Sequence, residues 1–206
     1  VPYIGVHAPV PAGRTVHLSG WGWDDVQASW TWPGCEGRAL NVVVYFDCDE
    51  VELRLNGASV GTVPVTAESK YLATFAVPYQ PGELTAIARR GGTPVAESTL
   101  VTAGPPAQLR LTPDRAGIHA DRNDLSYVTV EIVDAQGRAL PQADALFYAT
   151  LRGPGRIAAV ANADPKNTDL YSGRTHRLWR GRGLVIVQPL GTAGEITLNV
   201  TADGLA

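Results

Sequence analysis

Hydrophobic and polar residues alternate along most of the chain in short runs, and this period of two is typical of half-buried β-strands. The clearest runs are residues 40–46 and 51–55. Asn56-Gly57 follows the second run at once, and this dipeptide accepts the positive φ angles of a tight type I′ turn. Residues 59–61 should therefore return antiparallel to 51–55 as a hairpin, and helical periodicity is nearly absent.

Strand patterning continues as far as a proline-rich connector. Residues 71–77 and 83–88 alternate, with Pro81-Gly82 as the turn between them. Residues 103–107 have no alternation, and their two prolines favour a short, stiff, extended segment. We therefore place a domain boundary there.

The same pattern restarts after the connector. Residues 128–132 and 196–200 alternate, and 184–187 is an unbroken apolar run that should be a central strand covered on both faces. Each half holds about seven short strands, which is typical of a sandwich of ~100 residues. The sequence thus predicts an all-β fold of two consecutive immunoglobulin-like β-sandwich domains, residues 1–103 and 104–206.

Length and composition narrow the function classes. With 206 residues the chain is too short for a (β/α)₈ barrel, which usually takes about 250. No stretch approaches the ~20 apolar residues of a membrane span, and a formal net charge of -3 argues against nucleic acid as a partner. The chain begins without Met or a leader-like segment, so we expect a piece of a longer protein whose targeting signal lies upstream.

Spacing also argues against a metal site, a cofactor or a disulfide. The four histidines are scattered and do not follow zinc-binding patterns, so neither a metal nor a cofactor is expected. An extended strand separates Cys35 from Cys48, which predicts two free thiols.

Two motifs resemble catalytic patterns without their structural context. Residues 57–61 spell G-x-S-x-G, but a nucleophile elbow needs a helix after the serine, and here a hairpin turn opens the motif. Glu50 and Glu52 share a strand face, so they should point together into water instead of facing each other across a cleft. We predict no catalytic residue in this chain.

An N-terminal segment is dense in tryptophan, and its positions are the candidate site residues: Trp21, Trp23, Trp30 and Trp32. Such rings bury large apolar area against a neighbouring domain, fill the core of their own domain, or stack on a sugar. All three roles are compatible with the sequence. We interpret the four residues as a contact to substrate or to another domain.

Several blocks of this sequence resemble the C-terminal part of glycoside hydrolase family 2 enzymes of the bacterial β-galactosidase type. The resemblance covers nearly the whole chain and is specific in aggregate. The blocks with the most distinctive residues are 22–34, Asp49-Glu50-Val51-Glu52-Leu53, Leu55-Asn56-Gly57, 102–106, 124–131 and Asn162-Ala163-Asp164-Pro165.

This resemblance implies a division of labour. In that family the catalytic glutamates belong to a (β/α)₈ barrel that precedes these modules, so none can be carried onto this chain. It implies a non-catalytic accessory fragment of a retaining β-galactosidase-like hydrolase, with the barrel of the same parent chain as partner and a periplasmic or secreted location. The alternative is a carbohydrate-binding module that targets the enzyme to a polysaccharide.

Overall fold

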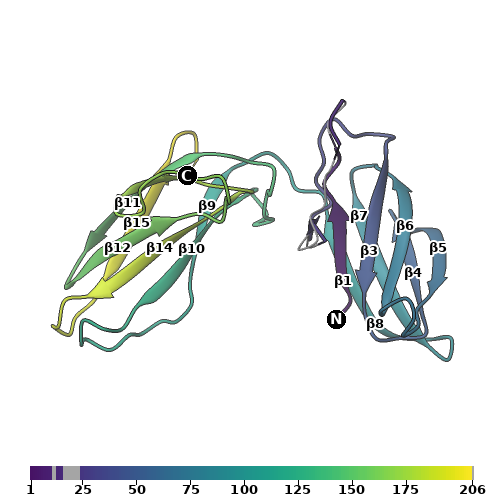
Figure 1. Cartoon of the computed structure of the whole chain (residues 1–206), viewed down its shortest axis with the longest axis horizontal. Coiled ribbons are helices and arrows are strands. Elements are labelled where there is room, and N and C mark those ends of the chain that lie inside the picture. Colours follow the sequence, from purple (N-terminus) through teal and green to yellow (C-terminus); the bar gives the residue numbers. More distant parts are fainter. Residues whose placement is uncertain (11–12, 16–23, 206) are drawn as a thin grey trace. The chain divides into compact units, whose positions relative to one another are not determined.

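The computed structural model describes residues 1–10, 13–15 and 24–205, and these form β-strands joined by turns and loops (Figure 1). They divide into two compact units, Val1–Thr102 and Ala103–Ala206. None of the described residues belongs to a helix long and apolar enough to cross a membrane.

The first unit is a sandwich of two four-stranded antiparallel sheets, in the orders β2-β1-β3-β6 and β5-β4-β7-β8. Its strands are β1 (Tyr3–His7), β2 (Val26–Gln27), β3 (Ala39–Tyr45), β4 (Glu50–Leu55), β5 (Ala58–Pro64), β6 (Leu72–Pro78), β7 (Glu83–Arg90) and β8 (Thr93–Val101).

Alternation in the sequence decides which side chains fill this first sandwich. Val42 and Val44 on β3 and Val51 and Leu53 on β4 are all inaccessible to solvent, and they meet in one core between the sheets. The predicted hairpin is confirmed. Asn56 has φ 50° and Gly57 has φ 82°, which are the left-handed angles of a type I′ turn, and β5 pairs antiparallel with β4.

The second unit is a sandwich of a four-stranded sheet, ordered β12-β14-β10-β9, and a three-stranded sheet, ordered β13-β11-β15. Its strands are β9 (Gln108–Pro113), β10 (Ser126–Val133), β11 (Leu146–Arg152), β12 (Gly155–Ala161), β13 (Thr175–Arg177), β14 (Arg182–Pro189) and β15 (Thr197–Ala202).

A separate core, which includes Val130, Phe147 and Val185, stabilises this second sandwich. The apolar run 184–187 is in β14, which is central in its sheet as expected. Only one face of β14 is fully covered, because buried and half-buried residues alternate along it. The expectation of coverage on both faces was therefore wrong, since β14 belongs to an antiparallel sheet with a single packed face.

Candidate functional site

Trp30, one of the four candidate tryptophans, lies inside the first sandwich. It is 0% exposed, and its ring meets Tyr79 edge-on with centroids 5.0 Å apart. The indole N–H donates to the carbonyl of Gln80 at 2.9 Å, and the Trp30 carbonyl accepts from the Thr102 hydroxyl at 2.6 Å. The indole N–H and the backbone carbonyl of Trp30 thus both have partners within the unit, as in a core residue.

Trp32 is held in the same way. Its indole N–H donates to the carbonyl of Ser29 at 3.1 Å, and its backbone N–H donates to the Tyr79 hydroxyl at 3.1 Å. Trp21 and Trp23 lie outside the described residues. The contact of the tryptophan segment with substrate or another domain stays a prediction.

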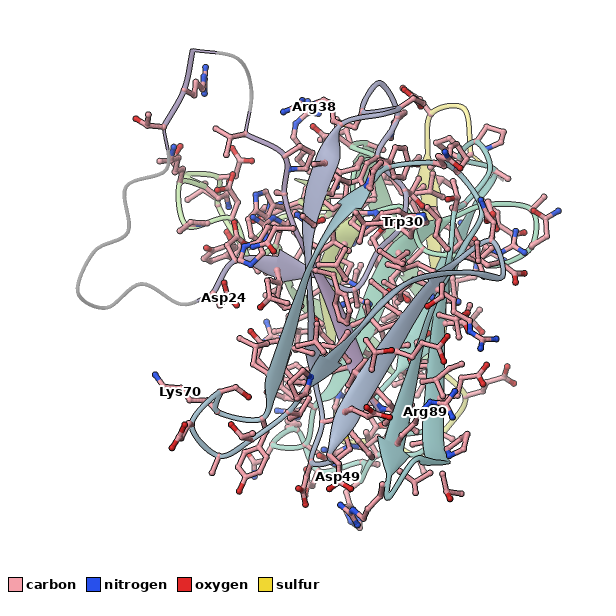
Figure 2. The ribbon with its side chains drawn as sticks, turned by 90° about the vertical axis from the view of Figure 1, so that its right-hand side faces the viewer. Asp24, Trp30, Arg38, Asp49, Lys70 and Arg89 are labelled. Carbon is pink, nitrogen blue, oxygen red and sulfur yellow. The ribbon has the colours of Figure 1, made fainter. Side chains whose placement is uncertain are left out.

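A polar cluster on the outer face of the first sheet was not anticipated from the sequence. It consists of Tyr3, His7, Asp24 and Tyr45, and we call it the Asp24 cluster. Tyr3 and Tyr45 are cross-strand partners, and their ring centroids are 6.2 Å apart with the planes tilted by 51°. Asp24 lies just before β2, at the margin of the sheet, whereas Trp30 lies among the strands (Figure 2).

The outward direction of these side chains follows from the alternation of β1. Ile4 and Val6 point into the core, so Tyr3, Gly5 and His7 share the outer face. Gly5 makes room for β2, because a Cβ there would lie 2.8 Å from the side chain of Val26. The placement of Tyr3 and His7 on either side of a glycine was the available sequence signal. Asp24 is far from both along the chain, so no local pattern indicates that it joins them.

One hydrogen bond and one longer polar contact join the side chains of Tyr45 and His7 to the Asp24 carboxylate. The Tyr45 hydroxyl donates to Asp24 Oδ2 at 2.5 Å, and His7 Nε2 lies 3.4 Å from Asp24 Oδ1. The hydrogen bond to Asp24 raises the pKa of Tyr45 to about 12, with burial and the negative charge of Asp24 adding to the effect. The Tyr45 hydroxyl therefore keeps its proton at neutral pH.

Glu52, considered above as one of two paired carboxylates, is held by two arginines. Its oxygens accept from Arg54 Nε at 2.8 Å and from Arg89 Nη2 at 2.7 Å, and its side chain is only 11% exposed. Hydrogen bonds from Arg54 and then Arg89 lower its pKa to about 2. Glu52 is thus a covered, ionised group, and the expectation that it points freely into water was wrong.

The second sandwich repeats this arrangement at Glu131 on β10. Arg110 Nη2 donates to one carboxylate oxygen at 2.8 Å, and Arg182 Nε donates to the other at 2.7 Å. Burial alone would raise the pKa of Glu131, but hydrogen bonds from Arg110 and Arg182 outweigh it and hold the pKa below its usual range. We call each of these two sites an arginine clamp.

The remaining motifs have structural roles among the described residues. Ser59 of the G-x-S-x-G pattern lies on β5, with no helix after it. Asp121 and Asp124 accept hydrogen bonds from backbone N–H groups of their own loop, and no group of three potential metal ligands is found in the described part of the chain. The cysteines are buried free thiols, as predicted.

A cavity of about 450 Å³ opens at one end of the second sandwich. Side chains from β9, β10, β14 and β15 form its apolar walls, including Leu111, Val128, Val187 and Leu198. Arg115, in the loop after β9, also lines it, but the Arg115 guanidinium is already paired with Asp114 and Asp124.

These features define a class: two consecutive units, each an antiparallel β-sandwich. Residues 109–206 match the model described as glycoside hydrolase family 2 C-terminal domain 5, and residues 37–96 match a domain of unknown function, DUF4982. The chain belongs to glycoside hydrolase family 2 and corresponds to the C-terminal region of its enzymes.

Individual relatives show the same family across most of the chain. A β-galactosidase of Bacteroides ovatus, BoGH2A, is 37% identical over 189 residues, which cover 89% of this chain and 22% of that protein. A putative β-glucuronidase of Formosa agariphila is 30% identical over 138 residues, covering 66% of this chain and 13% of that protein.

Solved structures agree with the sequence matches. A glycosyl hydrolase family 2 member from Bacteroides cellulosilyticus is similar over 100% of this chain and 27% of its own, with a TM-score of 0.90 and 35% identity. The matched part of this chain therefore spans between 13% and 27% of the length of these relatives.

Proposed function

We propose that this chain is a non-catalytic C-terminal accessory part of a retaining β-galactosidase-type hydrolase, and that it packs against the catalytic domain of the same protein. The observation that carries the proposal is the extent of the match, 89% of this chain against 22% of a β-galactosidase. Nearly all of the chain thus corresponds to one limited part of a long hydrolase.

The state of the carboxyl groups supports a non-catalytic role. A retaining glycosidase needs two carboxyl groups about 5 Å apart, and one of them must have a raised pKa to donate a proton. The two most covered glutamates, Glu52 and Glu131, have lowered pKa values because arginines hold them. An ionised, clamped carboxylate cannot serve as the general acid.

The tryptophan segment is the contact to the catalytic domain that we propose. Two described residues that flank Trp21 and Trp23 in the sequence, Val10 and Asp24, are hydrogen-bonded to residues in or next to β3. The carbonyl of Val10 accepts from Arg38 Nη2 at 3.2 Å, and Asp24 accepts from Tyr45. Trp21 and Trp23 lie between Val10 and Asp24 in the sequence.

The test compares this chain with a longer protein that contains it. The isolated chain should fold and should not hydrolyse aryl β-galactosides. In the longer protein, Trp21→Ala and Trp23→Ala should lower the thermal stability or the activity, while Tyr127→Ala, an exposed position of the second unit, should not. Hydrolysis by the isolated chain would refute the non-catalytic role, and unchanged stability and kinetics in both tryptophan variants would refute the packing contact.

A further inference from the structure

The Asp24 cluster presents an apolar aromatic surface next to a carboxylate. Tyr3 is 47% exposed, and its ring is tilted against that of Tyr45, so the two form a bent, partly open floor on the outer face of the sheet. The side chains of His7 and Asp24 beside it are 32% and 44% exposed. An accessible aromatic face can receive an apolar ligand face, and polar groups beside it can fix the orientation of that ligand.

The donors and acceptors of the cluster that are already paired determine which ligand groups it can bind. The Tyr45 hydroxyl gives its only proton to Asp24, so its oxygen is left as an acceptor. A neutral His7 with its proton on Nε2, directed at Asp24, leaves Nδ1 as a second acceptor. The carboxylate itself only accepts, and each oxygen has a further lone pair. The cluster therefore offers several acceptors side by side.

A surface of this kind selects by charge. An anionic ligand would bring a second negative charge next to Asp24 without gaining donors, whereas hydroxyl groups supply the protons that the acceptors need. An ammonium group could pair with the carboxylate and contact a ring face, but it has no apolar ring face to cover the two tyrosines. A neutral pyranose has both an apolar ring face and adjacent hydroxyl donors, so it fits both parts of the site.

We propose that Tyr3, His7, Asp24 and Tyr45 form a binding site for a neutral pyranoside, with the sugar ring over Tyr3 and its hydroxyl groups donating to Asp24, Tyr45 and His7. The site goes beyond the accessory packing role. It belongs wholly to the first unit, so it can be tested on this 206-residue chain without the catalytic domain.

The experiment titrates this chain with methyl β-galactoside and, as a matched anionic ligand, methyl β-glucuronide, by calorimetry and saturation-transfer NMR. We expect saturable binding of the galactoside in the millimolar range and much weaker binding of the glucuronide. Tyr3→Ala and Asp24→Ala should each weaken galactoside binding by about tenfold, because each removes one half of the site. Tyr127→Ala, which removes an exposed tyrosine of the second unit, should leave binding unchanged.

Thermal unfolding of each variant separates loss of binding from loss of structure, and Asp24→Asn gives a second test that keeps the side-chain shape. Removal of the charge should reduce the discrimination against the glucuronide. The proposal is overturned if the wild-type chain shows no saturable galactoside binding, if the glucuronide binds equally well, or if both alanine variants bind like wild type. Binding of a lysine-rich peptide in place of the sugars would assign the site to a protein partner and would also overturn it.

Discussion

Replacement of Trp30 with alanine distinguishes a core tryptophan from a contact tryptophan. The side chain is completely buried, it packs edge-on against Tyr79, and its N–H is bound to the carbonyl of Gln80. If the ring serves the fold of the first unit, the cost of the substitution must appear in this chain alone, without any catalytic domain or sugar.

The structure allows the size of that cost to be worked out. Truncation of a buried tryptophan to alanine costs about 3–5 kcal/mol in the free energy of unfolding, which includes the cavity left behind. Within that loss, the edge-on ring pair contributes about 0.5–1.5 kcal/mol, and leaving the Gln80 carbonyl without its donor contributes about 1–3 kcal/mol. Because domains are stable by only about 5–15 kcal/mol, Trp30→Ala should bring the first unit close to unfolding. Trp30→Phe, which keeps a ring but loses the N–H, should cost less.

Native-state hydrogen exchange provides the assay because it reads the two units separately. Amides of Val42 and Val51 should lose protection in Trp30→Ala, whereas Val130 in the second core should keep it. A change of less than about 1 kcal/mol in the first unit would be ordinary for an exposed site, and it would refute the core role. Equal losses in both units would contradict the division into separate cores.

Three further substitutions and probes test other parts of the structure. Because folding lowers the pKa of Glu52 from 4.5 to about 2, the stability it contributes at neutral pH should be lost as pH falls through that range. Glu52→Gln should flatten this dependence in acid titrations of unfolding. Gly181→Ala should destabilise the second unit by more than about 1 kcal/mol in denaturant unfolding. Gly181 has φ 70°, and a Cβ there would lie 2.2 Å from a backbone oxygen. An unchanged stability would contradict the described turn. Cys35 and Cys48 should react with a thiol reagent only on unfolding, because both are buried and burial raises the pKa of Cys48. Rapid labelling of the native chain would contradict this expectation.

Strand positions could be predicted from the sequence because a half-buried strand leaves a local trace. The alternation of residues 40–46 and 51–55 fixes which side chains enter the core, and Asn56-Gly57 fixes the turn between β4 and β5. These signals need only neighbouring residues. The two-sandwich fold follows from them with the spacing of the turns.

The arginine clamps could not be predicted because they depend on register between strands distant in sequence. Arg89 is the direct cross-strand partner of Glu50, yet its guanidinium reaches diagonally to Glu52. A shift of one residue would turn it to the other face. The core position of Trp30 could not be predicted for the same reason, because Tyr79, which packs against it, is far along the chain.

The carboxylates of this chain differ in how many strong donors each oxygen already has, and that difference separates structural groups from groups that can face a ligand. In each arginine clamp both oxygens are taken by guanidinium groups, and the side chain is at most 11% exposed. Burial of such a charge is tolerated because charge-assisted hydrogen bonds offset its desolvation, but the same bonds leave little for a ligand to gain. Among the described residues, the side chain of Asp24 contacts a tyrosine hydroxyl and a more distant imidazole, and 44% of it is exposed. Its remaining lone pairs can therefore accept from a ligand at little cost in lost protein contacts, which is why the binding site is assigned to Asp24 and not to the more deeply buried glutamates.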